Sequence, residues 1–375
     1  MAGIYIHIPF CKQACYYCNF HFSTSRSQQG AMVSALEAEL LLQKDYLADQ
    51  TVTSIYFGGG TPSLLLPEEL QHLLAQCRQL FQLPPHPEIT LEANPDDLSR
   101  EKLQALRAAG INRLSIGVQS FHEEDLRWMN RAHNATQAIQ SIRDAQAEGF
   151  ENITIDLIYG GPTLSDEGWA QNLEQVKALN IPHLSSYALT VEPGTALDHF
   201  IRQHKVQAVD PDKAARHFET LMTWAADNGY EHYEISNFAR TGWHSRHNSS
   251  YWQGQPYLGI GPSAHSFNGH SRQWNVSNNA GYLQVIQGQS VPFEMEILTP
   301  TIRLNEYLMT SLRTAQGASL AFIGATFGQD KVQHLEAAVA PYVASGKMHP
   351  VTDWLRLTNA GKLFADGIAA DLFFS

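Results

Sequence analysis

Short apolar runs alternate with longer amphipathic segments over the first two-thirds of the chain. The short runs predict strands, and the segments in which apolar residues recur every three or four positions predict helices. The predicted strands cover residues 3–8, 53–57, 88–92, 112–118, 152–158 and 183–189. The predicted helices cover residues 32–47 and 67–80 and begin near Ser99, Thr136 and Asp166. Because helices separate the strands, we expect parallel pairing through right-handed crossovers.

Three glycines, Gly110, Gly149 and Gly229, follow predicted helices and precede predicted strands. A glycine in this place commonly adopts the left-handed conformation that ends a helix. The repetition predicts about six strand–helix units, which favours a complete or partial (β/α) barrel over a short open sheet.

The later part of the chain has a different pattern. Residues 244–279 are rich in Gly, Ser, Asn, His and aromatic side chains, and we expect irregular loops there. From about residue 304 the pattern predicts two helices, the second over 330–344, then a two-stranded ribbon over 348–357 and a last helix from Asn359. This order resembles a small winged-helix module.

The chain is therefore predicted to be an α/β protein in three parts. A partial (β/α) barrel of about six parallel strands covers residues 1–235. A loop-rich connecting segment covers residues 236–295, and a small, mainly helical, winged-helix-like domain covers residues 296–375.

The composition excludes several classes of protein. The 375 residues carry 25 basic and 37 acidic side chains, a net charge of −12, which argues against a nucleic-acid partner because phosphate binding needs Lys and Arg. No apolar run approaches the roughly 18 residues of a membrane span, and the N-terminus lacks the pattern of a signal peptide. We expect a cytoplasmic protein, attached to a membrane at most peripherally, as a monomer or homodimer.

Three of the four cysteines, Cys11, Cys15 and Cys18, directly follow the first predicted strand. A tetrahedral zinc site needs four ligands, and no nearby residue completes one. Three thiolates suit a [4Fe–4S] cluster in which one iron lacks a protein ligand and can bind an external molecule. The fourth cysteine, Cys77, has the apolar spacing of a predicted helix, and we expect it to be a buried hydrophobic residue.

Polar or side-chain-free residues stand at or near the ends of four further predicted strands. They are the glycine run 58–60 with Thr61, Glu92, Gln119 and Asp156. Each alone is as consistent with a structural role as with a ligand contact. Because the carboxyl ends of parallel strands meet at one edge, together they predict a polar ligand site beside the cysteine loop.

The C-x3-C-x2-C spacing, with an aromatic residue before its last cysteine, resembles the radical S-adenosylmethionine (SAM) superfamily. Further segments, YIHIPFC, GGGTP, LEANP, SIGVQSF and IDLIYG, resemble its oxygen-independent coproporphyrinogen III oxidase branch. The resemblance implies a radical SAM barrel with SAM on the open iron of the cluster. By motif, it implies SAM contacts from Tyr5, Tyr17, Gly59 and Glu92. It also implies that Gly60, Thr61, Gln119, Arg131 and Asp156 line the same cavity.

Two functions compete within this branch. The oxidase has a further cysteine two positions after the triad, where this chain has Phe20, and an N-terminal arm for which we expect no room before the first strand. The segment 246–252, RHNSSYW, contains the HNxxYW motif and resembles the HemW family of haem chaperones. This resemblance implies that His247 belongs to a haem site, with His244 and His265 as other candidates for the axial ligand. The expected function is to bind haem and transfer it to an acceptor protein; the alternative is oxidative decarboxylation of coproporphyrinogen III.

Overall fold

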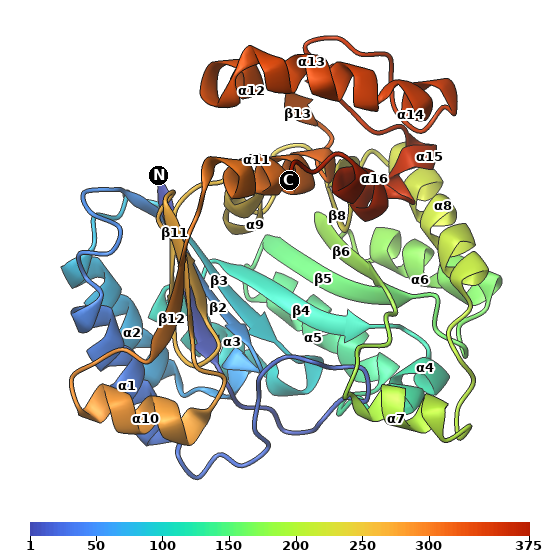
Figure 1. Ribbon diagram of the computed structural model, residues 1–375. Coiled ribbons are helices and arrows are strands. Elements are labelled where there is room, and N and C mark those ends of the chain that lie inside the picture. Colours follow the sequence, from blue (N-terminus) through green and yellow to red (C-terminus); the bar gives the residue numbers. More distant parts are fainter.

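The computed structural model describes residues 1–375 and is built around one twelve-stranded sheet (Figure 1). In spatial order the strands are β12, β11, β10, β9, β1, β2, β3, β4, β5, β6, β8 and β7. Six neighbouring strands are parallel: β1 (Ala2–Ile8), β2 (Val52–Gly59), β3 (Glu88–Ala93), β4 (Arg113–Gln119), β5 (Asn152–Tyr159) and β6 (His183–Ala188). The prediction of about six parallel strands in a sheet that does not close is confirmed.

Helices connect these strands and bury their apolar faces against the sheet in one large core. They are α1 (Gln29–Leu42), α2 (Pro67–Leu80), α3 (Arg100–Ala109), α4 (Glu123–Trp128), α5 (Ala135–Ala147), α6 (Asp166–Ala178), α7 (Ala196–Arg202) and α8 (Pro211–Asp227). Gly110, at the end of α3, has a φ of 103°, as its place after a helix predicts. Cys77 is completely buried in α2, so its expected role as a core residue is confirmed.

The prediction of irregular loops over residues 244–279 is wrong. The segment contains α9 (Arg246–Trp252), β9 (Tyr257–Ile260), β10 (His265–Phe267) and β11 (Ser271–Asn275). β9 pairs in parallel with the free edge of β1, and β10, β11 and β12 (Phe293–Ile297) continue the sheet in antiparallel order. These strands are short and rich in polar and turn residues. Their conformation comes from pairing with β1, a partner that local periodicity does not reveal.

Glu39 of α1 fastens this extension of the sheet to the main unit. Its buried carboxylate accepts hydrogen bonds from the Gly261 amide (2.7 Å), the Tyr282 hydroxyl (2.6 Å) and the Asn275 side chain (2.7 Å). Tyr282 lies in α10 (Asn279–Gln287). Burial raises the pKa of Glu39, which the hydrogen bonds oppose. A carboxylate that joins three separate segments fixes where the extension lies.

At the other edge of the sheet, β6 pairs with β8 (Asn237–Ala239), which pairs with β7 (Glu231–Glu234). The C-terminal part is mainly helical and has its own apolar core. Its helices are α11 (Pro300–Leu312), α12 (Leu320–Phe327), α13 (Gln329–Ala338), α14 (Ala340–Ala344), α15 (Asn359–Lys362) and α16 (Ala365–Asp371).

The ribbon predicted over 348–357 is reduced to one bridge, between Met348 and Leu357. Within it, β14 (Trp354–Leu355) pairs instead with β13 (Ala318–Ser319). The predicted domain boundary at residues 295/296 falls inside β12, and the three-part division of the chain stays a prediction. No helix of the structure has both the length and the apolar character needed to cross a membrane.

Candidate functional site

The cysteine loop lies at the carboxyl ends of the parallel strands, as predicted. Cys11, Cys15 and Cys18 form no disulfide and line a cavity of about 1080 Å³. Burial raises the pKa of the Cys11 thiol to about 11, and burial also raises the pKa of Cys18. Because burial disfavours the thiolate form, these side chains would ionise fully only beside a positive charge such as a metal centre.

The cavity brings together most of the residues that the sequence predicted. Its lining includes Tyr17, Gly59, Gly60, Thr61, Glu92, Gln119, Arg131 and Asp156. Gln119, at the end of β4, has a φ of 65°, which is uncommon for a residue other than glycine. The backbone of Gln119 is therefore strained at the point where its polar side chain meets the cavity.

Gly59 shows why the glycine run cannot carry side chains. Its φ is 105°, and a Cβ atom there would lie 2.5 Å from the imidazole of His7. At Gly60 a Cβ atom would lie 2.6 Å from the Phe10 carbonyl oxygen. The run therefore packs closely against β1 while its other side faces the cavity.

Two partly buried carboxyl groups give this cavity its acidic lining. Glu92 accepts hydrogen bonds from the Tyr56 hydroxyl (2.8 Å) and the Gly59 amide (3.1 Å). Burial raises the pKa of Glu92 to about 7 and the pKa of Asp156 to about 6. A ligand that carries positive charge would favour the ionised form of both groups.

Arg131 is a partly buried cation at the wall of this cavity. Its guanidinium donates to the Asn94 side chain (2.6 Å) and the Gly117 carbonyl (2.7 Å), which fixes its direction. It also lies 3.4 Å from the sulfur of Cys15 and 3.5 Å from the hydroxyl of Tyr17. Arg131 is thus placed to stabilise negative charge on Cys15, and the sequence predicted its presence but not this contact.

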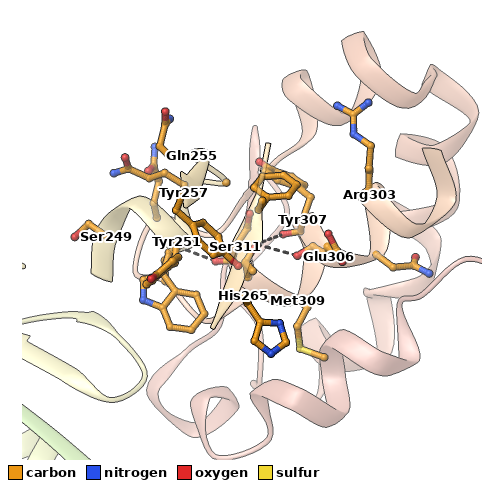
Figure 2. Close-up of a pocket in the computed structure, with 18 of the residues that line it drawn as sticks. Ser249, Tyr251, Gln255, Tyr257, His265, Arg303, Glu306, Tyr307, Met309 and Ser311 are labelled. Atoms are coloured by element: carbon orange, nitrogen blue, oxygen red, sulfur yellow. Dashed lines mark hydrogen bonds between the residues drawn. The ribbon is translucent and has the colours of Figure 1, made fainter. Parts of the chain in front are cut away.

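Tyr5 lies outside this cavity. It lines a second cavity, shown in part in Figure 2, together with Tyr257, His244 and His265. The hydroxyl of Tyr5 lies 3.3 Å from Nδ1 of His7. Its predicted contact with SAM stays a prediction.

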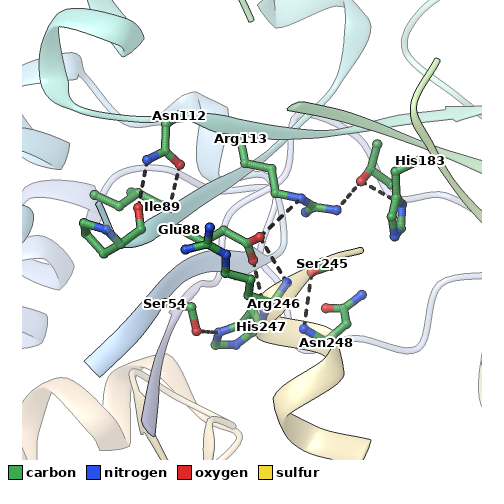
Figure 3. Close-up of polar contacts among 12 residues, drawn as sticks. Ser54, Glu88, Ile89, Asn112, Arg113, His183, Ser245, Arg246, His247 and Asn248 are labelled. Atoms are coloured by element: carbon green, nitrogen blue, oxygen red, sulfur yellow. Dashed lines mark hydrogen bonds and ion pairs between the residues drawn. The ribbon is translucent and has the colours of Figure 1, made fainter. Parts of the chain in front are cut away.

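The predicted place of His247 in a haem site stays a prediction, and the structure shows what its side chain contacts. Its side chain is buried, with Nδ1 2.8 Å from the Ser54 hydroxyl (Figure 3). Its Nε2 lies 2.9 Å from the Tyr251 hydroxyl. Burial lowers its pKa to about 3, so the ring is neutral and has one donor and one acceptor nitrogen. Both ring nitrogens have hydrogen-bond partners within the chain.

The surrounding contacts explain what the motif does. Glu88 accepts hydrogen bonds from the backbone amides of Arg246 and His247, each at 3.0 Å, and so binds the amino end of α9 (Figure 3). Arg113 lies 4.0 Å from the same carboxylate. Ser54, Glu88 and Arg113 stand near the starts of β2, β3 and β4, so α9 docks at the amino ends of the strands, away from the cysteine loop. The sequence analysis missed Glu88 and Arg113, although charged residues in apolar strands were a signal.

The comparisons with known proteins agree with this architecture. The Radical SAM superfamily pattern matches residues 5–176, and the HemN C-terminal domain pattern matches residues 298–364. A protein of Mycobacterium tuberculosis (strain ATCC 25618 / H37Rv) named "Heme chaperone HemW" is 36% identical over 99% of this chain and 94% of its own. This chain belongs to the HemW family. A second HemW, from Bacillus subtilis (strain 168), is 32% identical over 98% of both chains.

The HemW fold also resembles a solved oxidase structure. The coproporphyrinogen III oxidase HemN of Escherichia coli, a radical SAM enzyme, matches with a TM-score of 0.85 and 26% identity, over 99% of this chain and 90% of that one. The similarity thus includes the strand extension and the C-terminal helices as well as the barrel.

The radical SAM family implies a [4Fe–4S] cluster and SAM, and the residues present fit both. No group of three His, Cys, Asp or Glu side chains is close enough to hold a single metal ion. A cluster does not need such a group, because each cysteine binds a different iron. One cavity is lined by the three cysteines, which form no disulfide, and by Arg131, which lies beside Cys15. It also contains two acidic groups, which suit a cationic sulfonium ligand.

Proposed function

We propose that this chain binds haem and transfers it to an acceptor protein, and that it carries a [4Fe–4S] cluster and SAM at the carboxyl ends of its strands. The observation that carries the proposal is the similarity to proteins named as haem chaperones, at 32–36% identity over nearly the whole chain. The acceptor is proposed to be a protein that lacks its haem. We further propose a cytoplasmic location and a monomeric or homodimeric state.

In this proposal Cys11, Cys15 and Cys18 hold the cluster and leave one iron for SAM. The cluster and SAM together supply one-electron chemistry. The guanidinium of Arg131 lies beside the sulfur of Cys15, and the carboxylates of Glu92 and Asp156 would face the positive charge of SAM. The Tyr56 hydroxyl and the Gly59 amide orient Glu92. The rest of the cavity wall includes Tyr17, Gly60, Thr61 and Gln119. Tyr5 lies outside this cavity, in the lining of the second one.

The oxidase is the second candidate, because the E. coli enzyme matches over 99% of this chain. Residue 20 favours the carrier. The side chain of Phe20 is 67% exposed at the cavity and has no group that can bind iron or donate a proton, whereas the oxidase resemblance calls for a cysteine there.

Two assays decide between the candidates. Titration of the purified protein with hemin, followed by Soret absorbance, should give a saturable one-to-one complex; its absence would contradict haem carriage. Anaerobic incubation of the reconstituted protein with reductant, SAM and coproporphyrinogen III should leave the substrate unchanged. Decarboxylation in proportion to the SAM consumed would instead identify the oxidase.

A further inference from the structure

The second cavity adjoins the cluster cavity and is larger, about 1880 Å³. Asn19 and Phe20 of the cysteine loop line both cavities. The walls come from α9 and the β9–β11 extension on one side and from α11 and α12 on the other (Figure 2). Its volume exceeds the roughly 300–1,000 Å³ of cavities that take drug-sized ligands, so the cavity has room for a larger ligand.

Aromatic rings from distant parts of the chain line this cavity. Tyr251 and Tyr257 contact each other edge to face at 4.6 Å, on the side of the sheet extension. Tyr307 and Phe322 lie 4.6 Å apart on the side of the C-terminal helices. Two aromatic walls that face one cavity provide apolar contacts for both faces of a planar macrocycle.

Five histidines line the cavity, and four of them have a ring nitrogen occupied by another group of the protein. His7 contacts the His21 carbonyl, and His21 contacts the Asn279 side chain. His232 contacts the Ile235 carbonyl, and His244 contacts the Glu231 carboxylate. His265 of β10 differs, because neither of its ring nitrogens has a hydrogen-bond or ion-pair partner in the chain. Its side chain is exposed to the cavity, and its ring stacks on Trp274 at 6.1 Å.

A further property suits His265 to bind iron. Partial burial lowers its pKa, and the neutral imidazole is the form that ligates metals.

Two arginines also line this cavity. Arg272 is paired with Glu306 at 2.7 Å, whereas Arg303 of α11 makes no hydrogen bond or ion pair through its side chain. A free guanidinium is the group expected to pair with a carboxylate of a bound ligand.

We propose that the second cavity is the haem site, with His265 as an axial ligand of the iron and Arg303 as a partner of a propionate. The inference rests on the proposed haem function and specifies where haem sits. It places the porphyrin beside the cluster loop, with Phe20 between the two cavities, and it gives Tyr251 of the HNxxYW motif a place in the wall.

Hemin titration of the full chain tests this placement. His265→Ala should weaken hemin binding by at least about tenfold, the lower end of what removing a partner of a metal site produces. Free imidazole should restore the histidine-type Soret spectrum in the His265→Ala complex. The control is His270→Ala, which removes an exposed histidine of the β10–β11 turn that does not line the cavity, and it should bind as the unaltered protein does.

Arg303 provides a second, independent measurement. Arg303→Gln should weaken hemin binding by about tenfold, as expected for a lost charged hydrogen bond, and Arg303→Lys should recover part of the loss. Circular dichroism checks that each variant is folded.

The outcomes separate the two proposals. If the unaltered protein binds hemin but His265→Ala has the same affinity and the same Soret spectrum, the placement is wrong and haem carriage stands. If the unaltered protein forms no saturable complex, both proposals are wrong.

Discussion

At the carboxyl ends of the parallel strands, cysteine and acidic side chains face a cavity. At the amino ends, Glu88 pairs with Arg113 and accepts hydrogen bonds from two backbone amides of α9. Both regions contain residues that commonly bind metals or catalyse reactions. They differ in whether those groups face a cavity. The His247 nitrogens and the Glu88 oxygens have partners within the chain and line neither of the two cavities. The three thiols form no disulfide, and Glu92 and Asp156, whose pKa values burial raises, face the cavity although each accepts hydrogen bonds.

Residue type therefore does not separate a binding site from a structural one. The difference is whether the groups line a cavity that can hold a ligand, as the cysteines and the two carboxyl groups do. Tyr56 joins the two regions: its ring stacks on His247 at 5.0 Å and its hydroxyl donates to Glu92.

The largest expected effect is the loss of the cluster. Cys15→Ala should abolish the visible absorbance of the reconstituted [4Fe–4S] cluster, because two thiolates and Arg131 cannot replace the missing ligand. The matched control is Cys77→Ala in the core of α2, which should lower stability by about 1–3 kcal/mol and keep the cluster. A cluster retained in Cys15→Ala would overturn the ligand assignment.

Glu88→Ala tests the amino-end region. It leaves buried Arg113 without its partner carboxylate and two amides of α9 without an acceptor, which should cost about 3–5 kcal/mol of unfolding free energy. Urea denaturation measures the loss. The folded variant should still take up the cluster, since Glu88 lies at the other end of the strands. Glu101→Ala, at an exposed position of α3, should leave the unfolding free energy nearly unchanged.

The pKa of Glu92 predicts a dependence on pH. Folding raises this pKa from its ordinary 4.5 to about 7, so the folded state binds more protons between these values and stability falls as pH rises through that range. The fall should reach up to about 3 kcal/mol in the cofactor-free protein. Glu92→Gln should remove this part of the fall, measured by urea denaturation at pH 5 and pH 8. An identical pH dependence in both proteins would contradict the assignment.

His247→Phe should have the smallest of these effects. The substitution keeps a ring against Tyr56 but leaves the hydroxyls of Ser54 and Tyr251 without their partner, at a cost of about 1–3 kcal/mol. If His247 acts by positioning Tyr251, the folded variant binds hemin more weakly but keeps the histidine-type Soret spectrum. Loss of that spectrum with imidazole rescue would make His247 itself the ligand. Tyr251→Phe, which breaks one of the two contacts, should cost about half as much.

The strand–helix alternation predicted the parallel unit well, because burial imposes a hydrophobic period on each strand and helix. Residues 257–275 escaped this reasoning, since β9 forms on the edge of β1 and its neighbours are held by Glu39. In the same way the carboxyl-end residues could be predicted, because parallel strands carry their ends to one edge whatever the details of packing. The partners of Arg131 and the second cavity could not, since they depend on side chains that approach from separate elements.

The sequence by itself determined the cysteine triad, its place after the first strand and the polar strand ends, because spacing and strand order are local properties of the chain. Only the tertiary structure shows that both ring nitrogens of His247 have partners and that those of His265 have none. His247 meets Ser54 across 193 residues of sequence, and His265 meets no partner at all. Hydrogen-bond satisfaction is a property of the packed molecule, so the spacing of residues along the chain does not reveal it.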